Sequence, residues 1–256
     1  TEKRLQSGIE ETRDFERLLS DALMACDSEA CPIFNDGDPV GAYLSAMEKI
    51  DLVNEARPNL QDAGLFGVVS TLYDEATWPV LWEGVAELDA NDDPEILATS
   101  SDFQASDSDI REIEWINCLD DWSIYPAFTR EDQLSASQMF DDVFDTEFPL
   151  LAAASVLEDS ISLCPFFDTI VPAPLDVPLD GADVPILVIG NPSDPATPFS
   201  ESEELVEETL TNGFLLEADN PAHVVFGRGN RCVDDTVVAV LVDIEFPAER
   251  RTVCPR

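Results

Sequence analysis

Two residues near the carboxyl terminus have the types and the spacing of an acid–base pair. Asp194 follows the apolar run 184–190, and His223 follows a second, shorter apolar run at 214–218. Each residue comes just after the carboxyl end of an expected strand, where catalytic groups gather in open α/β sheets. His223 is the only histidine in the chain. Because imidazole titrates near neutrality, we expect His223 to be the base in any chemistry at neutral pH.

An acid followed by a histidine fits the last two places of a catalytic triad. A serine hydroxyl is a poor nucleophile until a base takes its proton, and a carboxylate on the other ring nitrogen orients that base. In α/β-hydrolases the triad follows the chain order Ser, Asp or Glu, His. A solvent-exposed loop histidine is the alternative interpretation of His223. The triad interpretation predicts about 2.6–3.2 Å between the Asp194 carboxylate and a ring nitrogen.

The nucleophile of such a triad is not recognisable in this sequence. The serine should lie in a G-x-S-x-G turn between a strand and a helix, and no such motif occurs. Ser70 lies in an expected helix, and Ser193 is adjacent to the proposed acid. No glycine-rich oxyanion segment is visible either, and the chain begins at Thr1 rather than Met. We therefore expect a processed or partial chain that is inactive alone, with the serine outside it.

The elements around the pair predict an α/β segment over residues 179–256. The continuous apolar run 184–190 is typical of a strand buried on both faces of a parallel sheet. Ser200 and Glu203 have the spacing of a capping box that opens a helix to about residue 211. Asp234 is expected to cap the last helix. Two strands alone do not make a stable sheet, so we interpret this segment as the carboxy-terminal portion of an α/β-hydrolase core.

Residues 1–178 are expected to form a mostly helical lid. Asp38 and Pro39 resemble an N-cap followed by proline at the first helical position. Further helices are expected over 60–73 and from near Thr77 through Leu88, and the proline-rich stretch 171–178 is expected to be an extended connector. A buried helical face is predicted by apolar residues at helical spacing, namely Phe15, Leu18, Leu19, Ala22 and Leu23.

The charge of the chain is strongly acidic. It has 54 acidic and 13 basic residues, for a formal net charge of −41. Such a chain repels nucleic acid and anionic lipid surfaces, and no apolar run is long enough to predict a membrane span. Because the acidic residues are spread along the chain, we favour a surface adapted to high salt. An acidic surface that captures cationic ligands is the alternative.

The cysteines predict disulfides rather than a metal site. No C-x-x-C occurs and only one histidine is present, so we expect neither a zinc site nor a cofactor. An even number of widely spaced cysteines suits three disulfides in an oxidising compartment, although the sequence alone allows about 15 connectivities. The six positions are Cys26, Cys31, Cys118, Cys164, Cys232 and Cys254.

Several stretches resemble secreted tripeptidyl aminopeptidases and related exported α/β-hydrolases. The resemblance is carried by 184–191, by Asp194-Pro195-Ala196-Thr197-Pro198 and by 232–235. On the amino-terminal side it continues in Leu72-Tyr73 followed by Trp78-Pro79, and in Asn117-Cys118 followed by Asp120. The chain departs from the family at Ser193 and Ala222, where members usually carry glycine.

The resemblance implies roles for the residues named so far. Asp194 would be the triad acid and His223 the base. The disulfides would join Cys26 to Cys31 and Cys232 to Cys254, which leaves Cys118 with Cys164. The first strands, the oxyanion segment and the serine would belong to an amino-terminal core segment that precedes this sequence and acts as its partner.

The function implied is that of a secreted or cell-surface serine hydrolase. We expect an aminopeptidase that releases short peptides from the amino termini of peptides. An esterase acting on a small ester is the first alternative. A non-catalytic hydrolase relic that serves as a binding or structural protein is the second. An intact serine motif in the upstream coding sequence would separate the enzymes from the relic.

Overall fold

The protein is described here by a computed structural model that covers residues 2–50, 53, 64–100, 130–154, 184–220 and 222–255. The chain divides into two compact units. One unit comprises Thr1–Leu72 and Ala76–Asp176, and the other comprises Tyr73–Glu75 and Val177–Arg256. The expected connector at 171–178 and the residues Cys118 and Cys164 lie outside the described residues.

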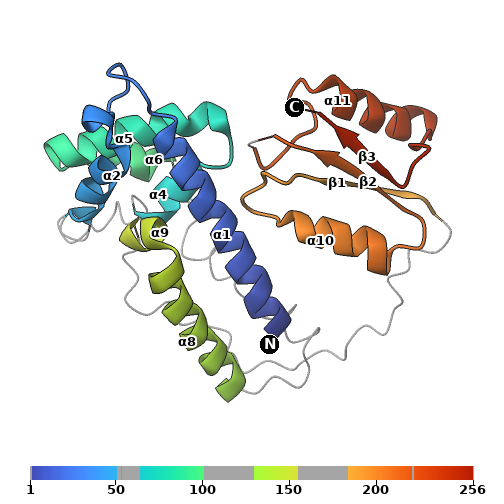
Figure 1. The fold of residues 1–256 in the computed structure, drawn as a ribbon, viewed down its shortest axis with the longest axis horizontal. Helices are drawn as coiled ribbons and strands as arrows, with labels where there is room; N and C mark the ends of the chain where they lie inside the picture. Colours follow the sequence, from blue (N-terminus) through green and yellow to red (C-terminus); the bar gives the residue numbers. More distant parts are fainter. Residues whose placement is uncertain are drawn as a thin grey trace. The chain divides into compact units, whose positions relative to one another are not determined.

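The described part of the first unit is helical. Its longest helix, α1, packs against α8 and α9, while α5 packs against α2 and α6. In Figure 1 these helices run from blue through green to yellow. The helices are α1 (Glu2–Met24), α2 (Pro39–Met47), α4 (Leu65–Ser70), α5 (Trp78–Asn91), α6 (Glu95–Ser100), α8 (Arg130–Glu147) and α9 (Pro149–Ala154), with 3₁₀ turns η1 (Asn35–Gly37) and η3 (Glu75–Thr77).

The helical spacing predicted the buried face of α1 correctly. The five apolar residues from Phe15 to Leu23 named above are all buried. The predicted cap of α2 is also present, because the Asp38 carboxylate accepts from the backbone N–H of Gly41 at 2.9 Å. The helix expected over 60–73 is shorter, since α4 ends at Ser70. The hydroxyl of Thr71 bonds to the Val68 carbonyl at 2.6 Å there.

A buried junction fixes the start of α9 against α1 and α2. The two carboxylate oxygens of Glu16 accept from the backbone N–H groups of Leu150 and Leu151, each at 2.9 Å. These N–H groups have no partner inside the helix, so Glu16 acts as a cap from another helix. The Tyr43 hydroxyl donates to the Leu150 carbonyl at 2.8 Å. Burial, with the nearby Glu16 charge, raises the pKa of Tyr43 far above its usual range.

The second unit contains a three-stranded parallel sheet of order β1-β2-β3. Its strands are β1 (Ile186–Gly190), β2 (Gly213–Ala218) and β3 (Arg251–Cys254). The first two were predicted from their apolar runs. The third was not, because Arg251-Thr252-Val253-Cys254 lacks an apolar run. The α/β fold class predicted from the sequence is confirmed.

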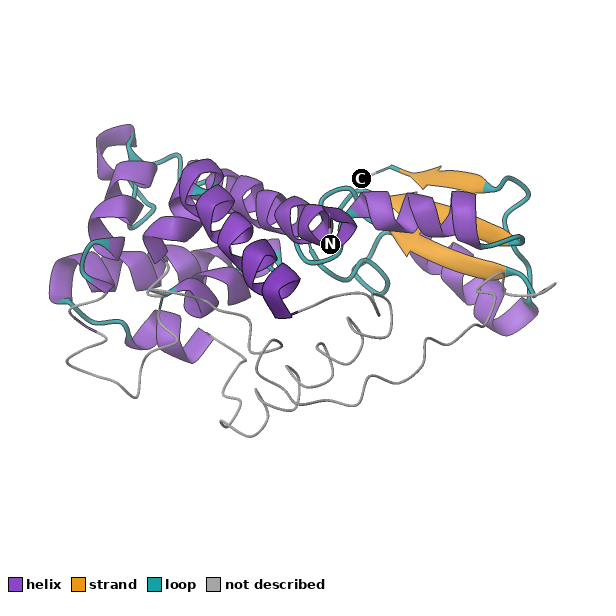
Figure 2. Cartoon of the chain, turned by 90° about the horizontal axis from the view of Figure 1, so that it is seen from below, coloured by secondary structure: helices purple, strands orange, loops and turns teal. Residues whose placement is uncertain are grey.

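Helices cover both faces of this sheet, as Figures 1 and 2 show for α10 and α11. One face buries Leu216 and Ala218 of β2 beneath Val233 and Val237. On the other face, Leu215 of β2 is buried, as are Val206 and Leu210 in and next to η5, which packs against this strand. The covering elements are α10 (Phe199–Glu204), its π-helical continuation η5 (Leu205–Thr209), α11 (Arg231–Val238) and its continuation η6 (Ala239–Asp243).

Two helix starts differ from the predictions. Helix α10 begins at Phe199 with Pro198 at the cap position and no side-chain cap bond, so the capping box from Ser200 is wrong. Helix α11 is capped by Asn230, whose side chain accepts from the N–H groups of Cys232 and Val233. Asp234 therefore lies inside α11, and its carboxylate accepts from the Gly227 N–H at 2.7 Å. In both cases the cap lies earlier in the chain than the residue we chose.

Two of the expected disulfides are present, Cys26–Cys31 and Cys232–Cys254. The first closes a small loop after α1. The second joins α11 to the last residue of β3. It therefore ties the carboxyl end of the chain to the layer that covers the sheet.

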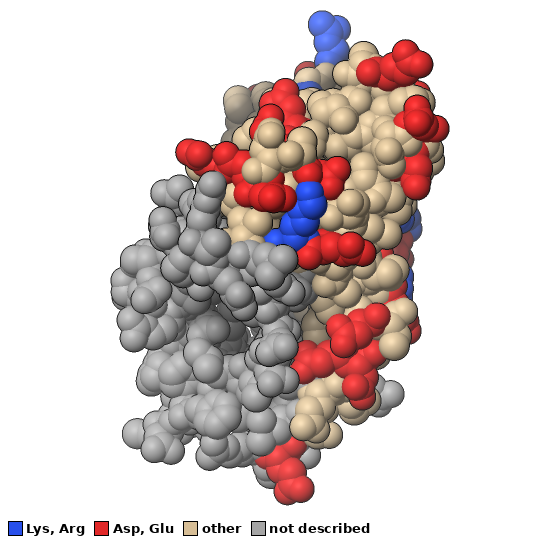
Figure 3. Space-filling view, turned by 90° about the vertical axis from the view of Figure 1, so that its left-hand side faces the viewer, with Lys and Arg blue, Asp and Glu red and all other residues tan. Residues whose placement is uncertain are grey.

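Among the charged side chains on the face that Figure 3 shows, most are acidic. Asp and Glu side chains are scattered over this face of the described residues, with few Lys and Arg among them. Among the helices described, none is long and apolar enough to cross a membrane. Repulsion among so many like charges opposes the compact state.

We predict that Glu16→Ala lowers the free energy of unfolding by about 1–3 kcal/mol, because two N–H groups of α9 lose their acceptor. The measurement is urea-induced unfolding followed by circular dichroism. Glu48→Ala is the control, because Glu48 is exposed, and it should change stability by less than about 0.5 kcal/mol. Equal effects of the two substitutions would contradict the capping role.

We also predict that the melting temperature rises as KCl increases from about 0.05 M to about 1 M, because salt screens repulsion among the acidic residues. Differential scanning calorimetry measures this directly, with sucrose as a non-ionic control. A melting temperature that stays flat or falls with KCl would favour a surface that captures specific cations.

Candidate active site

The Asp194 carboxylate is buried and held by hydrogen-bond donors of its own loop. Its side chain is only 5% exposed. Oδ1 accepts from the backbone N–H groups of Ala196 at 2.8 Å and Thr197 at 3.1 Å, and Oδ2 accepts from the Thr197 hydroxyl at 2.8 Å. A buried carboxylate is costly unless such donors surround it. This loop is therefore built to keep a charged acid in one orientation.

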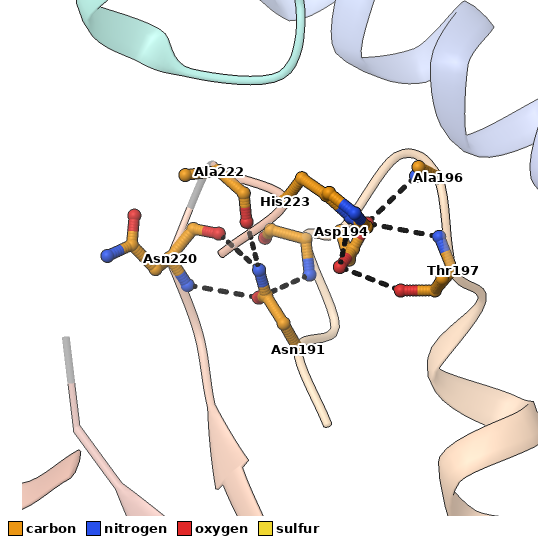
Figure 4. Close-up of polar contacts among 8 residues, drawn as sticks. Asn191, Asp194, Ala196, Thr197, Asn220, Ala222 and His223 are labelled. Carbon is orange, nitrogen blue, oxygen red and sulfur yellow. Dashed lines mark hydrogen bonds and ion pairs between the residues drawn. The ribbon is translucent and has the colours of Figure 1, made fainter. Parts of the chain in front are cut away.

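The imidazole of His223 completes the set of groups around Asp194. Nδ1 lies 3.0 Å from Oδ1 and 3.1 Å from Oδ2, as Figure 4 shows. An ionised carboxylate can only accept hydrogen bonds, so Nδ1 is the ring nitrogen that donates in this contact. The His223 side chain is 37% exposed, unlike that of Asp194. The pair thus has a buried carboxylate beside an imidazole that solvent can reach, and the distances between them fall within the predicted range.

A segment distant in sequence supports the histidine loop. The backbone N–H of His223 donates to the Tyr73 carbonyl at 2.9 Å. The Tyr73 ring lies edge-on to the imidazole, with centroids 5.4 Å apart. Asp74 forms a β-bridge with Ala222 and an ion pair with Arg228. The sequence offered only the likeness of Leu72-Tyr73 to the family, because a pairing over 150 residues leaves no local pattern.

The two departures from the family pattern are accommodated. Neither Ser193 nor Ala222 has a positive φ, so the backbone at these places does not require glycine. The Ser193 hydroxyl donates to Asp219 at 2.6 Å. No cluster of three or more possible metal ligands occurs among the residues that could be searched.

The comparisons with known proteins agree with this architecture. Residues 149–254 match the family model described as TAP-like protein. The chain is also 24% identical, over 264 aligned positions, to proteins named serine protease Hip1 from Mycobacterium bovis and Mycobacterium tuberculosis. That alignment covers 93% of this chain and 48% of each relative. The chain thus spans about half the length of the curated relatives it matches.

The parallel sheet covered by helices and the family match together indicate the α/β-hydrolase fold. Within that class, the match of residues 149–254 to the TAP-like family agrees with the resemblance seen in the sequence.

We predict that Thr197→Val destabilises the protein by about 1.5–3 kcal/mol, because a charged, buried acceptor loses one donor while the side-chain volume is kept. Thr236→Val is the matched control, since its hydroxyl donates to the Cys232 carbonyl within the same helix and not to a carboxylate. The control should cost less than about 0.5 kcal/mol. Equal losses in urea unfolding would mean that Thr197 does not hold the acid.

Proposed function

We propose that Asp194 and His223 are the acid and base of a Ser–His–Asp triad in an exported serine peptidase. The observation that carries this proposal is the 3.0 Å contact between His223 Nδ1 and Asp194 Oδ1. Each partner lies just beyond the carboxyl end of one of two adjacent parallel strands. The match to proteins named serine protease supports the same chemistry. The nucleophilic serine is placed, in this proposal, outside the 256 residues of the sequence.

The proposed reaction uses the two nitrogens of His223 differently. The serine oxygen bonds to the substrate carbonyl carbon as its proton passes to Nε2. Asp194 accepts from Nδ1–H throughout and stabilises the imidazolium that forms. Nε2–H then gives the proton to the leaving amine as the carbon–nitrogen bond breaks. A water molecule repeats the same steps to release the acyl group and restore the serine.

The substrate we propose is the amino-terminal end of a peptide, from which short peptides are released. Residues 1–178 would act as the helical lid that shapes the substrate pocket. A carboxylate of such a lid would hold the substrate ammonium, which an esterase does not need. The two disulfides support an oxidising, extracytoplasmic location.

A fluorophosphonate labelling assay tests the triad. The purified chain should not react, whereas the chain combined with the product of the upstream coding sequence should be labelled at one serine of that product. Asp194→Asn should slow labelling by about 10³–10⁴-fold, because the imidazole loses its orienting carboxylate. Asp219→Asn is the matched control, an exposed carboxylate in the loop that precedes His223, and it should leave the rate within about twofold.

The substrate class is tested with matched peptides on the combined protein, that is, the chain together with the product of the upstream coding sequence. Peptides with free amino termini should be cleaved, and the same peptides with acetylated amino termini should not. Hydrolysis of small esters without cleavage of either peptide would establish the esterase instead. Stoichiometric labelling of the isolated chain would show that the nucleophile lies within it. Failure of the combined protein to react would favour the non-catalytic hydrolase relic.

A further inference from the structure

Asn191 is a buried polar residue that the proposed chemistry does not use. It directly follows β1 and is only 5% exposed. Its amide nitrogen Nδ2 donates to the carbonyls of Asn220 and Ala222, each at 2.7 Å. Its oxygen Oδ1 accepts from the backbone N–H groups of Ser193 at 3.0 Å and Asn220 at 3.1 Å. Both donors and both acceptor sites of the side chain are therefore occupied.

These four bonds join the loop that carries the acid to the loop that carries the base. Asn191 lies three residues before Asp194, and Asn220 lies three residues before His223. Three of the four bonds cross between the two loops, as Figure 4 shows for the bonds to Asn220 and Ala222. The fourth bond folds the acid loop back on itself at Ser193. One side chain thus fixes both loops just before the residues that must meet.

We propose that Asn191 is a positioning residue that holds the Asp194 loop and the His223 loop in the register at which Nδ1 meets the carboxylate. This proposal rests on the proposed function only in giving Asp194 and His223 a catalytic role. The hydrogen bonds themselves stand independently of any activity.

The chemistry of the side chain explains why asparagine suits this place. A carboxylamide offers two donors on one atom and two acceptor sites on the other. An aspartate here would keep the acceptor bonds but would face two carbonyl oxygens with no hydrogen to donate. An apolar residue would leave buried backbone groups without partners, each costing about 1–3 kcal/mol. The bond from Ser193 to Asp219 also links the two loops, but it is a single, exposed contact.

The chain has a single histidine, so the two ring-nitrogen signals of the ¹⁵N-labelled chain both come from His223 and the test is direct. In the wild-type chain we expect the Nδ1–H tautomer with a slowly exchanging proton. Asn191→Ala and Asn191→Asp should each speed exchange of that proton by at least about tenfold, because alanine removes all three bonds between the loops and aspartate removes the two that Nδ2 donates. Ser193→Ala, the matched control, removes the other link between the loops and should change exchange by less than about twofold.

The outcomes separate the inference from the proposed function. Faster exchange in both Asn191 variants, with a native amide spectrum and an unchanged Ser193→Ala, supports the positioning role. Unchanged exchange in the Asn191 variants would overturn the positioning role, and so would an equal effect of Ser193→Ala. Loss of the native amide spectrum even in Asn191→Asp would overturn it as well. A wild-type chain without the Nδ1–H tautomer, or an Asp194→Asn chain that keeps it, would instead defeat the proposed function.

Discussion

The parallel pairing of β1 with β2 is the interaction on which the candidate site depends. Gly190 and Glu217 lie side by side in this register, so the loops that follow the two strands start from neighbouring points of the sheet. Gly190 also allows α10 to approach, because a Cβ at this position would lie 2.7 Å from the Phe199 ring. On its other edge β2 pairs with β3, whose last residue is tied to α11 by a disulfide. The contact between Asp194 and His223 follows from this layered arrangement.

Local hydrogen bonds, rather than the overall charge of the chain, determine how the Asp194 carboxylate is held. The chain carries a formal net charge of −41, which in isolation would oppose another buried negative charge. Backbone N–H groups, a hydroxyl and an imidazole surround Asp194 at hydrogen-bond distance. Such close donors act at full strength in a buried site, while distant surface charges are screened by solvent and salt. An extremely acidic protein can therefore maintain a fixed, buried carboxylate.

The contact between Asp194 and His223 could be predicted from the sequence because the rule behind it is geometric. Residues that follow neighbouring parallel strands lie at one edge of the sheet, so the types and places of Asp194 and His223 were sufficient. Strand β3 escaped prediction because its four residues have no apolar run and only Cys254 is buried. Arg251 instead forms ion pairs with Glu203 and Glu217. The caps of α10 and α11 were misplaced for a similar reason, since several polar residues near each start could have served.

The supporting residues could not be found from local patterns. Asn191 acts through backbone atoms about 30 residues away, and Tyr73 contacts His223 across 150 residues. Neither contact depends on a periodic pattern or a motif that one sequence displays. They become visible only when the loops are seen together, which is why the structure extends the site beyond its two titratable groups.

The most direct measurement of the central claim is a crystal structure of the longer protein after reaction with a fluorophosphonate. We predict one phosphonylated serine, with His223 Nε2 about 2.6–3.2 Å from its oxygen and Nδ1 still bonded to Asp194. A labelled serine served by a different histidine would contradict it.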